Sequence, residues 1–174
     1  MTSFHRISTI AAFASGLLVG VPSFAADLPT QPVLTLSAAR QVAGAAEAKA
    51  RAAGWPCVIS VVDSAGVPIV LLRMDNAAVP AGVELAPGKA RTAALFRRSS
   101  GALEDAINGN RPAAATARGF VLMRGGVPIV ADGQIVGAIG VSADTPQHDE
   151  EIAQAGAAAL KESALDKHHD SHAH

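Results

Sequence analysis

Residues 125–142 read GGVPIVADGQIVGAIGVS, and this stretch predicts the centre of the fold. Two apolar runs, 127–131 and 134–142, lie on either side of Asp132-Gly133. An Asp-Gly pair between apolar runs is the strongest short-range signal for a tight hairpin turn. We therefore expect an antiparallel hairpin here.

A second hairpin is expected upstream, where residues 56–63 and 67–74 are apolar and β-branched and a short loop ending in Gly66 joins them. A fifth, short strand is expected at 120–123. Helical periodicity and cap residues predict helices at 36–53, 84–97, 100–107 and 146–165. The order α-β-β-α-α-β-β-β-α lacks strand–helix–strand alternation. It predicts an α+β fold, a single antiparallel five-stranded sheet flanked by helices.

Local signals add detail to two of these elements. Ser37 is the expected N-cap of the first helix, and Gly54 is expected to end that helix. Gly137 and Gly140 interrupt the last strand, and glycines there favour the close approach of a ligand or of another backbone. They do not form a dinucleotide-binding fingerprint, because a polar turn follows them rather than a helix.

The amino-terminal stretch predicts a secretory signal. His5 and Arg6 precede an apolar run at 7–21, and Ser23-Phe24-Ala25 has the small–x–small pattern of a cleavage site. The run is shorter than the roughly 20 residues of a spanning helix. We expect cleavage after Ala25 and a periplasmic or secreted protein without a membrane span. The expected organisation is a signal over 1–25, one domain over 26–166 and a His-rich tail over 167–174.

Composition excludes several classes of function. The formal net charge is −1 and no basic stripe is present, which argues against a nucleic-acid partner. Tyrosine is absent and aromatic residues make up 3% of the chain, which argues against a stacking platform for sugars or single strands. Cys57 is the single cysteine, so an intrachain disulfide is impossible, and we expect it to be a buried small apolar residue.

Several charged and histidine residues have both a functional and an ordinary interpretation. The strand end Arg73-Met74-Asp75 is either an anion site or a surface ion pair. Lys89, Thr92 and Phe96 share one helix face, which is either the boundary of an amphipathic helix or a ligand-facing surface. The tail is either incidental or binds a divalent metal through His168, His169, His172 and His174.

The stretch from residue 34 to residue 160 resembles the GlcG/HbpS family of haem-binding and haem-degrading proteins, which is related to the carboxy-terminal domain of the PduO cobalamin adenosyltransferases. The matching segments follow the family's order and are LTLSAARQVAGAAEAKARAAG, VVDSAGVPIVLLRMDNA, GKARTAALF, GGVPIVADGQIVGAIGVS and TPQHDEEIAQAGAAAL. The resemblance implies a profilin-like sheet with flanking helices, haem or another small molecule as ligand, and assembly as a homo-oligomer.

The resemblance also implies one shared pocket for the ligand. Its expected lining is Arg73, Met74, Asp75, Lys89, Arg91, Thr92, Phe96, Phe120, Met123, Gly125 and Gly126. His148 or a tail imidazole is the candidate axial ligand of haem iron. The acid–base candidates for catalysis are Asp75, Asp149 and Glu150.

Three functions remain open at this point. The favoured function is an exported haem- or small-ligand-binding protein of the cell envelope that assists haem breakdown or redox sensing. It is favoured because the sequence does not indicate a buried acid–base pair. An enzyme acting on haem or a small organic acid is the first alternative. An oligomeric scaffold or sensor partner without catalysis is the second.

Overall fold

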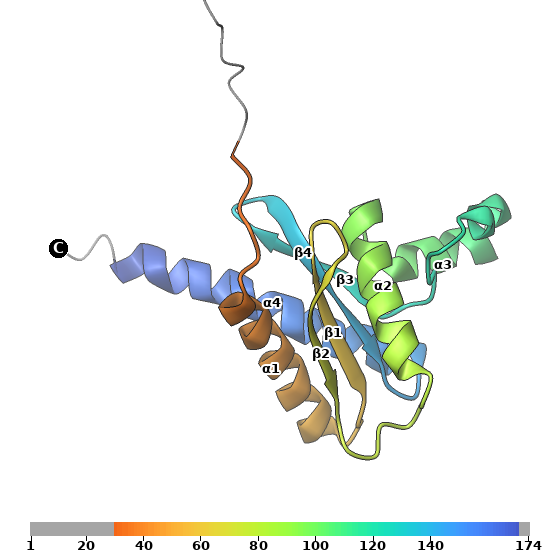
Figure 1. Ribbon diagram of the computed structural model, residues 1–174, viewed down its shortest axis with the longest axis horizontal. Coiled ribbons are helices and arrows are strands. Elements are labelled where there is room, and N and C mark those ends of the chain that lie inside the picture. The colour runs from red at the N-terminus through yellow and green to blue at the C-terminus, as the bar shows by residue number, and fades with distance from the viewer. Residues whose placement is uncertain (1–29, 171–174) are drawn as a thin grey trace, which may run out of the picture. The chain divides into compact units, whose positions relative to one another are not determined.

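The computed structural model describes the backbone of residues 30–170 and the side chains of residues 30–160 (Figure 1). The expected signal over 1–25 and the imidazoles of the His-rich tail lie outside these ranges. The helices are α1 (Leu36–Ala53), α2 (Gly82–Phe96), α3 (Ser100–Asn108), the 3₁₀ turn η1 (Pro112–Thr116) and α4 (Pro146–Asp170). The strands are β1 (Val58–Asp63), β2 (Pro68–Arg73), β3 (Gly126–Ala131) and β4 (Gln134–Ser142).

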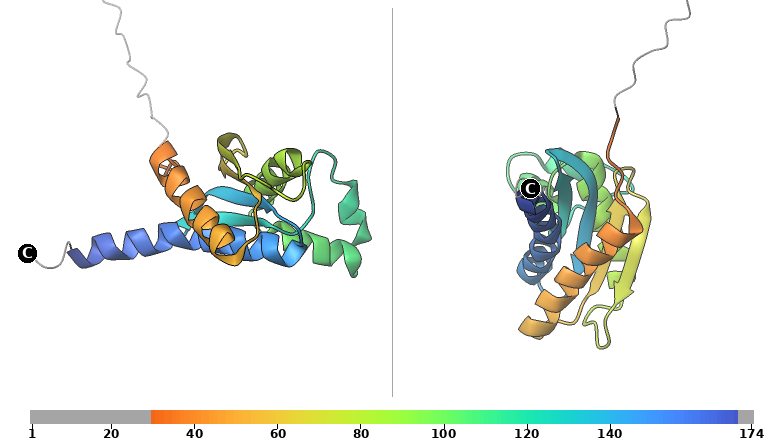
Figure 2. Two further views of the ribbon diagram at one scale, coloured as in Figure 1. Left: turned by 90° about the horizontal axis from the view of Figure 1, so that it is seen from below. Right: turned by 90° about the vertical axis from the view of Figure 1, so that its left-hand side faces the viewer.

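The strands form one antiparallel sheet in the order β2-β1-β4-β3, with helices on both faces (Figure 2). Successive side chains of a strand point to opposite faces of its sheet. Ile59 and Val61 of β1 therefore enter the core beneath α1 and α4, whereas Val62 packs with the small residues of α2. The α+β class and the antiparallel sheet are confirmed.

The predicted fifth strand at 120–123 is wrong, and the sheet has four strands. This segment lies along α2 through its side chains, where a Cβ at Gly88 would collide with the side chain of Val121. The following amide, of Arg124, donates to the carboxylate of Glu104 at 2.6 Å. The segment is therefore held by helices instead of a strand neighbour, and the element order is α-β-β-α-α-β-β-α with η1 after α3.

Both predicted hairpins are confirmed. Asp132 and Gly133 have φ values of 48° and 74°, the left-handed pair that a tight turn requires. In the first hairpin the carboxylate of Asp63 accepts hydrogen bonds from the amides of Ala65 and Val67, both at 2.9 Å. This side chain closes the turn locally.

The caps of α1 confirm one prediction and correct another. Gly54 ends the helix with φ 73°, and its amide donates to the carbonyls of Ala50 and Arg51. The N-cap is Thr35 rather than Ser37, because Thr35 keeps extended backbone angles and its hydroxyl accepts the amide of Ala38 at 3.2 Å. Ser37 already lies inside the helix.

Gly140 lets the backbone of α2 approach the sheet closely. A Cβ at Gly140 would lie 2.5 Å from the amide nitrogen of Ala90 and would also collide with the carbonyl oxygen of Ala86. Of the two possibilities that the sequence left open at this glycine, the structure therefore shows a backbone. This contact fixes α2 against β4 and so sets the position of Lys89.

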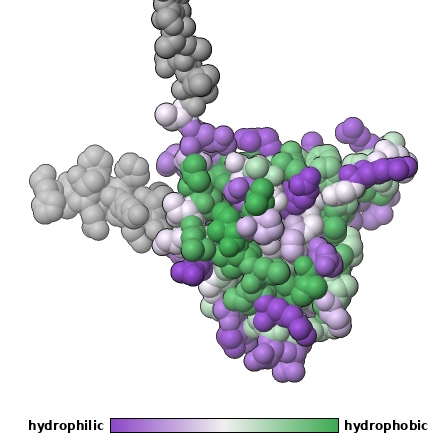
Figure 3. Space-filling model, in the orientation of Figure 1, coloured by the Kyte–Doolittle hydropathy of each residue, from purple (hydrophilic) through white to green (hydrophobic). Residues whose placement is uncertain are grey.

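The surface of the described chain carries apolar side chains on the edge strand β2 and the turn before it (Figure 3). Val67 is 57% exposed and Leu71 is 54% exposed. Over residues 30–170 no helix is both long and apolar enough to cross a membrane.

Candidate functional site

A buried ion pair joins α2 to α4 at one end of the sheet. Lys89 is 1% exposed, and its Nζ lies 2.5 Å from Oδ2 of Asp149 and donates to the carbonyl of Val141 at 3.1 Å. The other carboxylate oxygen of Asp149 accepts the amide of Ala143 at 2.5 Å. The sequence did not reveal this acid–base pair, because its members lie 60 positions apart.

The pair is enclosed by backbone as well as by side chains. A Cβ at Gly125 would lie 2.7 Å from Cβ of Asp149 and 3.3 Å from Nζ of Lys89, so the glycine turn packs directly on the pair. Burial raises the pKa of Asp149, opposed by the hydrogen bond and the charge of Lys89. Neither residue lines any of the three cavities described below. The ion pair therefore positions α2 against α4.

Arg124 holds the segment between η1 and β3 in place. Its guanidinium binds the carboxylates of Glu150, on α4, and Asp105, on α3. Gly101 makes room for it, since a Cβ there would lie 2.9 Å from the guanidinium. Glu150, an acid–base candidate, is thus engaged in one of the two ion pairs that tie α3 and α4 to this segment.

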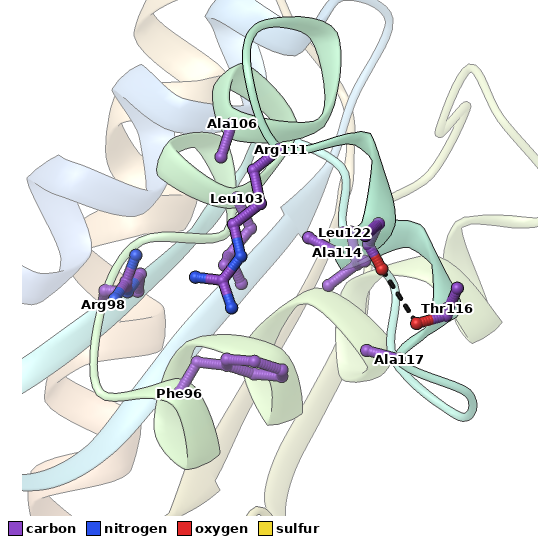
Figure 4. Close-up of a pocket in the computed structure, with 10 residues that line it drawn as sticks. Phe96, Arg98, Leu103, Ala106, Arg111, Ala114, Thr116, Ala117 and Leu122 are labelled. Atoms are coloured by element: carbon purple, nitrogen blue, oxygen red, sulfur yellow. Dashed lines mark hydrogen bonds between the residues drawn. The ribbon is translucent and has the colours of Figure 1, made fainter.

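A cavity of about 240 Å³ lies between the end of α2, α3 and η1 (Figure 4). Arg111 extends from the loop after α3 toward the ring of Phe96 (Figure 4). The lining is apolar except for two arginines and one threonine, and it consists of Phe96, Arg98, Leu103, Ala106, Arg111, Ala113, Ala114, Thr116, Ala117 and Leu122. No carboxylate stands among these described side chains, so the cavity is positively charged over an apolar floor.

The aromatic wall of this cavity is braced from outside. Phe120 meets Phe96 edge to face, with ring centroids 4.9 Å apart, and the guanidinium of Arg91 lies 5.5 Å from the centroid of Phe120. Edge-to-face aromatic pairs and cations over a ring face are both favourable arrangements. These contacts support the ring of Phe96 from one side, while the residue remains 36% exposed.

The predicted pocket residues are not gathered around one cavity. Phe96 lines the cavity above, Met74 and Asp75 line a second one beside Trp55, and Arg91 lines a third beside the β1–β2 turn. The remaining residues are placed in three ways. Lys89, Thr92, Gly125 and Gly126 are buried, Phe120 is half-buried, and Arg73 and Met123 are exposed.

His148 lies in the first turn of α4, next to Asp149 in the sequence. Its ring stacks on Trp55 with centroids 3.6 Å apart and an interplanar angle of 10°. Its Nδ1 lies 2.7 Å from the carboxylate of Asp144, and this hydrogen bond lowers the pKa of Asp144. His148 lines none of the three cavities.

Sequence reasoning missed the two arginines of the cavity. Arg98 and Arg111 lie on either side of the short helix α3, and the turn 108–112 reverses the chain between them. A nine-residue helix is about 13 Å long and separates its two flanks, so no short-range pattern in the sequence indicated that both arginines line one cavity.

Cys57 is expected to be unreactive in the native protein. Its side chain is fully buried, its Sγ lies 3.7 Å from Sδ of Met74, and burial raises its pKa to about 12. The thiolate is the reactive form, so little of it exists near pH 8. Mass spectrometry after iodoacetamide treatment should show no adduct on the native protein and one adduct after unfolding in urea. Native labelling at the rate of free cysteine would contradict this assignment.

Three comparisons place the chain among known proteins. Residues 34–158 match the family described as "Haem degrading protein HbpS-like". Protein GlcG of Escherichia coli (strain K12) is 39% identical over 115 residues, which cover 66% of this chain and 85% of GlcG. A double mutant of HbpS from Streptomyces reticuli is 33% identical with a TM-score of 0.72, covering 81% of this chain and 96% of HbpS.

A third relative is known as a complex with haem. The structure described as "PduOC:Heme Complex" is 29% identical with a TM-score of 0.67, and it covers 74% of this chain and 96% of that one. Residues 34–158, which the family matches, include the four strands and the residues that line the cavity. The chain therefore belongs to the GlcG/HbpS family, the HbpS-like haem-degrading proteins.

Proposed function

We propose that this protein binds haem, or a related planar acid, in the cavity between α2, α3 and η1. The observation that carries the proposal is that Arg98 and Arg111 both line a cavity whose other lining is mostly apolar and includes Phe96. Arginine forks bind carboxylates through two parallel hydrogen bonds. Apolar cavities with a few placed polar groups are the usual form of small-ligand sites.

The residues of the cavity suit one edge of haem. Arg98 and Arg111 would hold its two propionates, and the ring of Phe96 with Leu103 and Leu122 would pack against its hydrocarbon edge. Pockets that enclose drug-sized ligands are about 300–1,000 Å³. At about 240 Å³ this cavity takes an edge of the macrocycle and leaves the remainder outside. When bound, haem supplies a redox-active iron.

Binding is favoured over catalysis by the state of the acid–base candidates. Asp149 is paired with Lys89, Glu150 is paired with Arg124, and Asp75 lines a different cavity. An enzyme acting on haem or a small organic acid would need a general acid or base within hydrogen-bond reach of its substrate. The cavity offers none among its described lining residues.

The proposal includes a cellular setting and an assembly. The signal-like pattern of residues 1–25 supports export to the periplasm or beyond, where the protein would meet free haem. The exposed apolar edge of β2, with Val67 and Leu71, supports the homo-oligomer that the family resemblance implies. A role in haem breakdown or redox sensing would follow from such binding.

Titration with hemin tests the proposal. The purified protein should give a saturable Soret shift at micromolar hemin, because the arginines supply charge-assisted hydrogen bonds. Changing Arg98→Ala together with Arg111→Ala should weaken binding by about tenfold or more. Arg73→Ala is the matched control, since Arg73 is exposed and lies outside the cavity, and it should bind like the wild type. An unchanged affinity in the double variant would remove the cavity from the proposal.

A further inference from the structure

We infer that the cavity recognises a porphyrin through its carboxylates alone, so that iron-free and iron-containing porphyrin dicarboxylates bind alike. This inference rests on the proposed function, because it concerns the same site. It names the ligand class as planar apolar dicarboxylates rather than iron complexes. It also predicts that no side chain of the cavity ligates a bound iron.

The donor set of the cavity lacks the groups that hold haem iron. Proteins ligate this iron through histidine, cysteine, methionine or tyrosine. None of these residue types is among the ten described side chains that line the cavity. The polar groups present are two guanidiniums, which cannot act as metal ligands while charged, and the hydroxyl of Thr116, which donates to the carbonyl of Ala113 at 2.8 Å.

The other described side chains that could ligate iron are already engaged in contacts within the protein or lie apart from the cavity. His148 is stacked on Trp55 and bonded to Asp144. Cys57 and Met74 are buried against each other, with their sulfur atoms 3.7 Å apart. Met123 is exposed and does not line the cavity.

The two arginines, in contrast, keep their charges available for a ligand. Within residues 30–160, neither Arg98 nor Arg111 forms an ion pair, whereas Arg51 and Arg124 are bound to carboxylates of their own chain. Guanidinium stays charged throughout the physiological pH range. Paired propionates on one edge of a porphyrin present two neighbouring carboxylates to this pair of cations.

The size of the cavity leads to the same conclusion. A volume of about 240 Å³ accommodates an edge, so the centre of the macrocycle, where a metal sits, stays outside the lining residues. The contacts that determine affinity are then those of the propionates with Arg98 and Arg111, and of the ring edge with Phe96. The iron contributes little to these contacts.

Binding of three porphyrins shows whether the iron or the carboxylates determine the affinity. Hemin and metal-free protoporphyrin IX should bind with dissociation constants within about threefold of each other, measured by absorbance and porphyrin fluorescence. The dimethyl ester of protoporphyrin IX lacks both negative charges and should bind about tenfold or more weakly. Arg111→Ala should weaken hemin and protoporphyrin IX to the same extent, and His148→Ala should change neither.

The outcomes separate this inference from the proposed function. Hemin binding that exceeds protoporphyrin IX binding more than about tenfold, or a spectrum of imidazole-ligated iron that disappears in His148→Ala, overturns the inference and leaves haem binding intact. Equal binding of the ester and the free acid also overturns it. If neither hemin nor protoporphyrin IX binds, the proposed function itself fails.

Discussion

Replacing Asp149 by asparagine is expected to lower the free energy of unfolding by about 3–5 kcal/mol. The substitution keeps the shape of the side chain but leaves the ammonium of Lys89 charged, buried and without a counter-charge. Since small domains are stable by about 5–15 kcal/mol, this loss is a large part of the total. Urea unfolding followed through Trp55, the single tryptophan, measures it.

A double-mutant cycle shows whether the unpaired charge is the cause. Lys89→Met alone should also destabilise strongly, because it leaves the carboxylate of Asp149 buried with the amide of Ala143 as its remaining partner. The double variant, Lys89→Met with Asp149→Asn, should be more stable than the sum of the single changes implies. Glu47→Ala, which removes an exposed ion pair with Arg51, is the control and should change stability by less than about 1 kcal/mol. Additive single effects would refute the coupling.

The elements of the fold were predictable where a local pattern decides the structure. The turn Asp132-Gly133 and the helix end at Gly54 need left-handed backbone angles, so single residues reveal them. The false strand at 120–123 shows the limit of such patterns. A short apolar run has the same sequence signal whether it pairs in a sheet or packs on a helix, as this one does against Gly88.

The candidate site was less predictable because it depends on contacts between distant segments. Lys89 has the pattern of a helix-boundary residue, and only the approach of α4 shows it to be the partner of Asp149. The cavity arginines come from the loops on either side of α3, and residues 113–118, which supply part of the lining, follow no period that the sequence reveals. The GlcG/HbpS resemblance identified the family correctly, but the pocket lining that it implied is not gathered around one cavity in the structure.

Gly140→Ala is expected to be strongly destabilising although it adds only one methyl group. That methyl would meet the carbonyl of Ala86 and the amide of Ala90, both backbone atoms of α2, and the Cβ of Ala90 at 3.0 Å. Backbone cannot rotate away as a side chain can, so α2 must move off β4. Overpacking lowers stability by about 1–3 kcal/mol, and we expect the upper end of that range or more.

The same methyl group in an open position should have the opposite effect. Gly44 lies inside α1, and a Cβ there would meet no atom within 4 Å, so Gly44→Ala should raise stability by about 1 kcal/mol through helix propensity alone. Because α2 carries Lys89 and Phe96, its displacement in Gly140→Ala should also weaken hemin binding, which Gly44→Ala should not change. Urea unfolding of both variants, paired with hemin titration, measures the contrast. Stability of Gly140→Ala within about 0.5 kcal/mol of the wild type would show that the contact between α2 and β4 does not set the position of this helix.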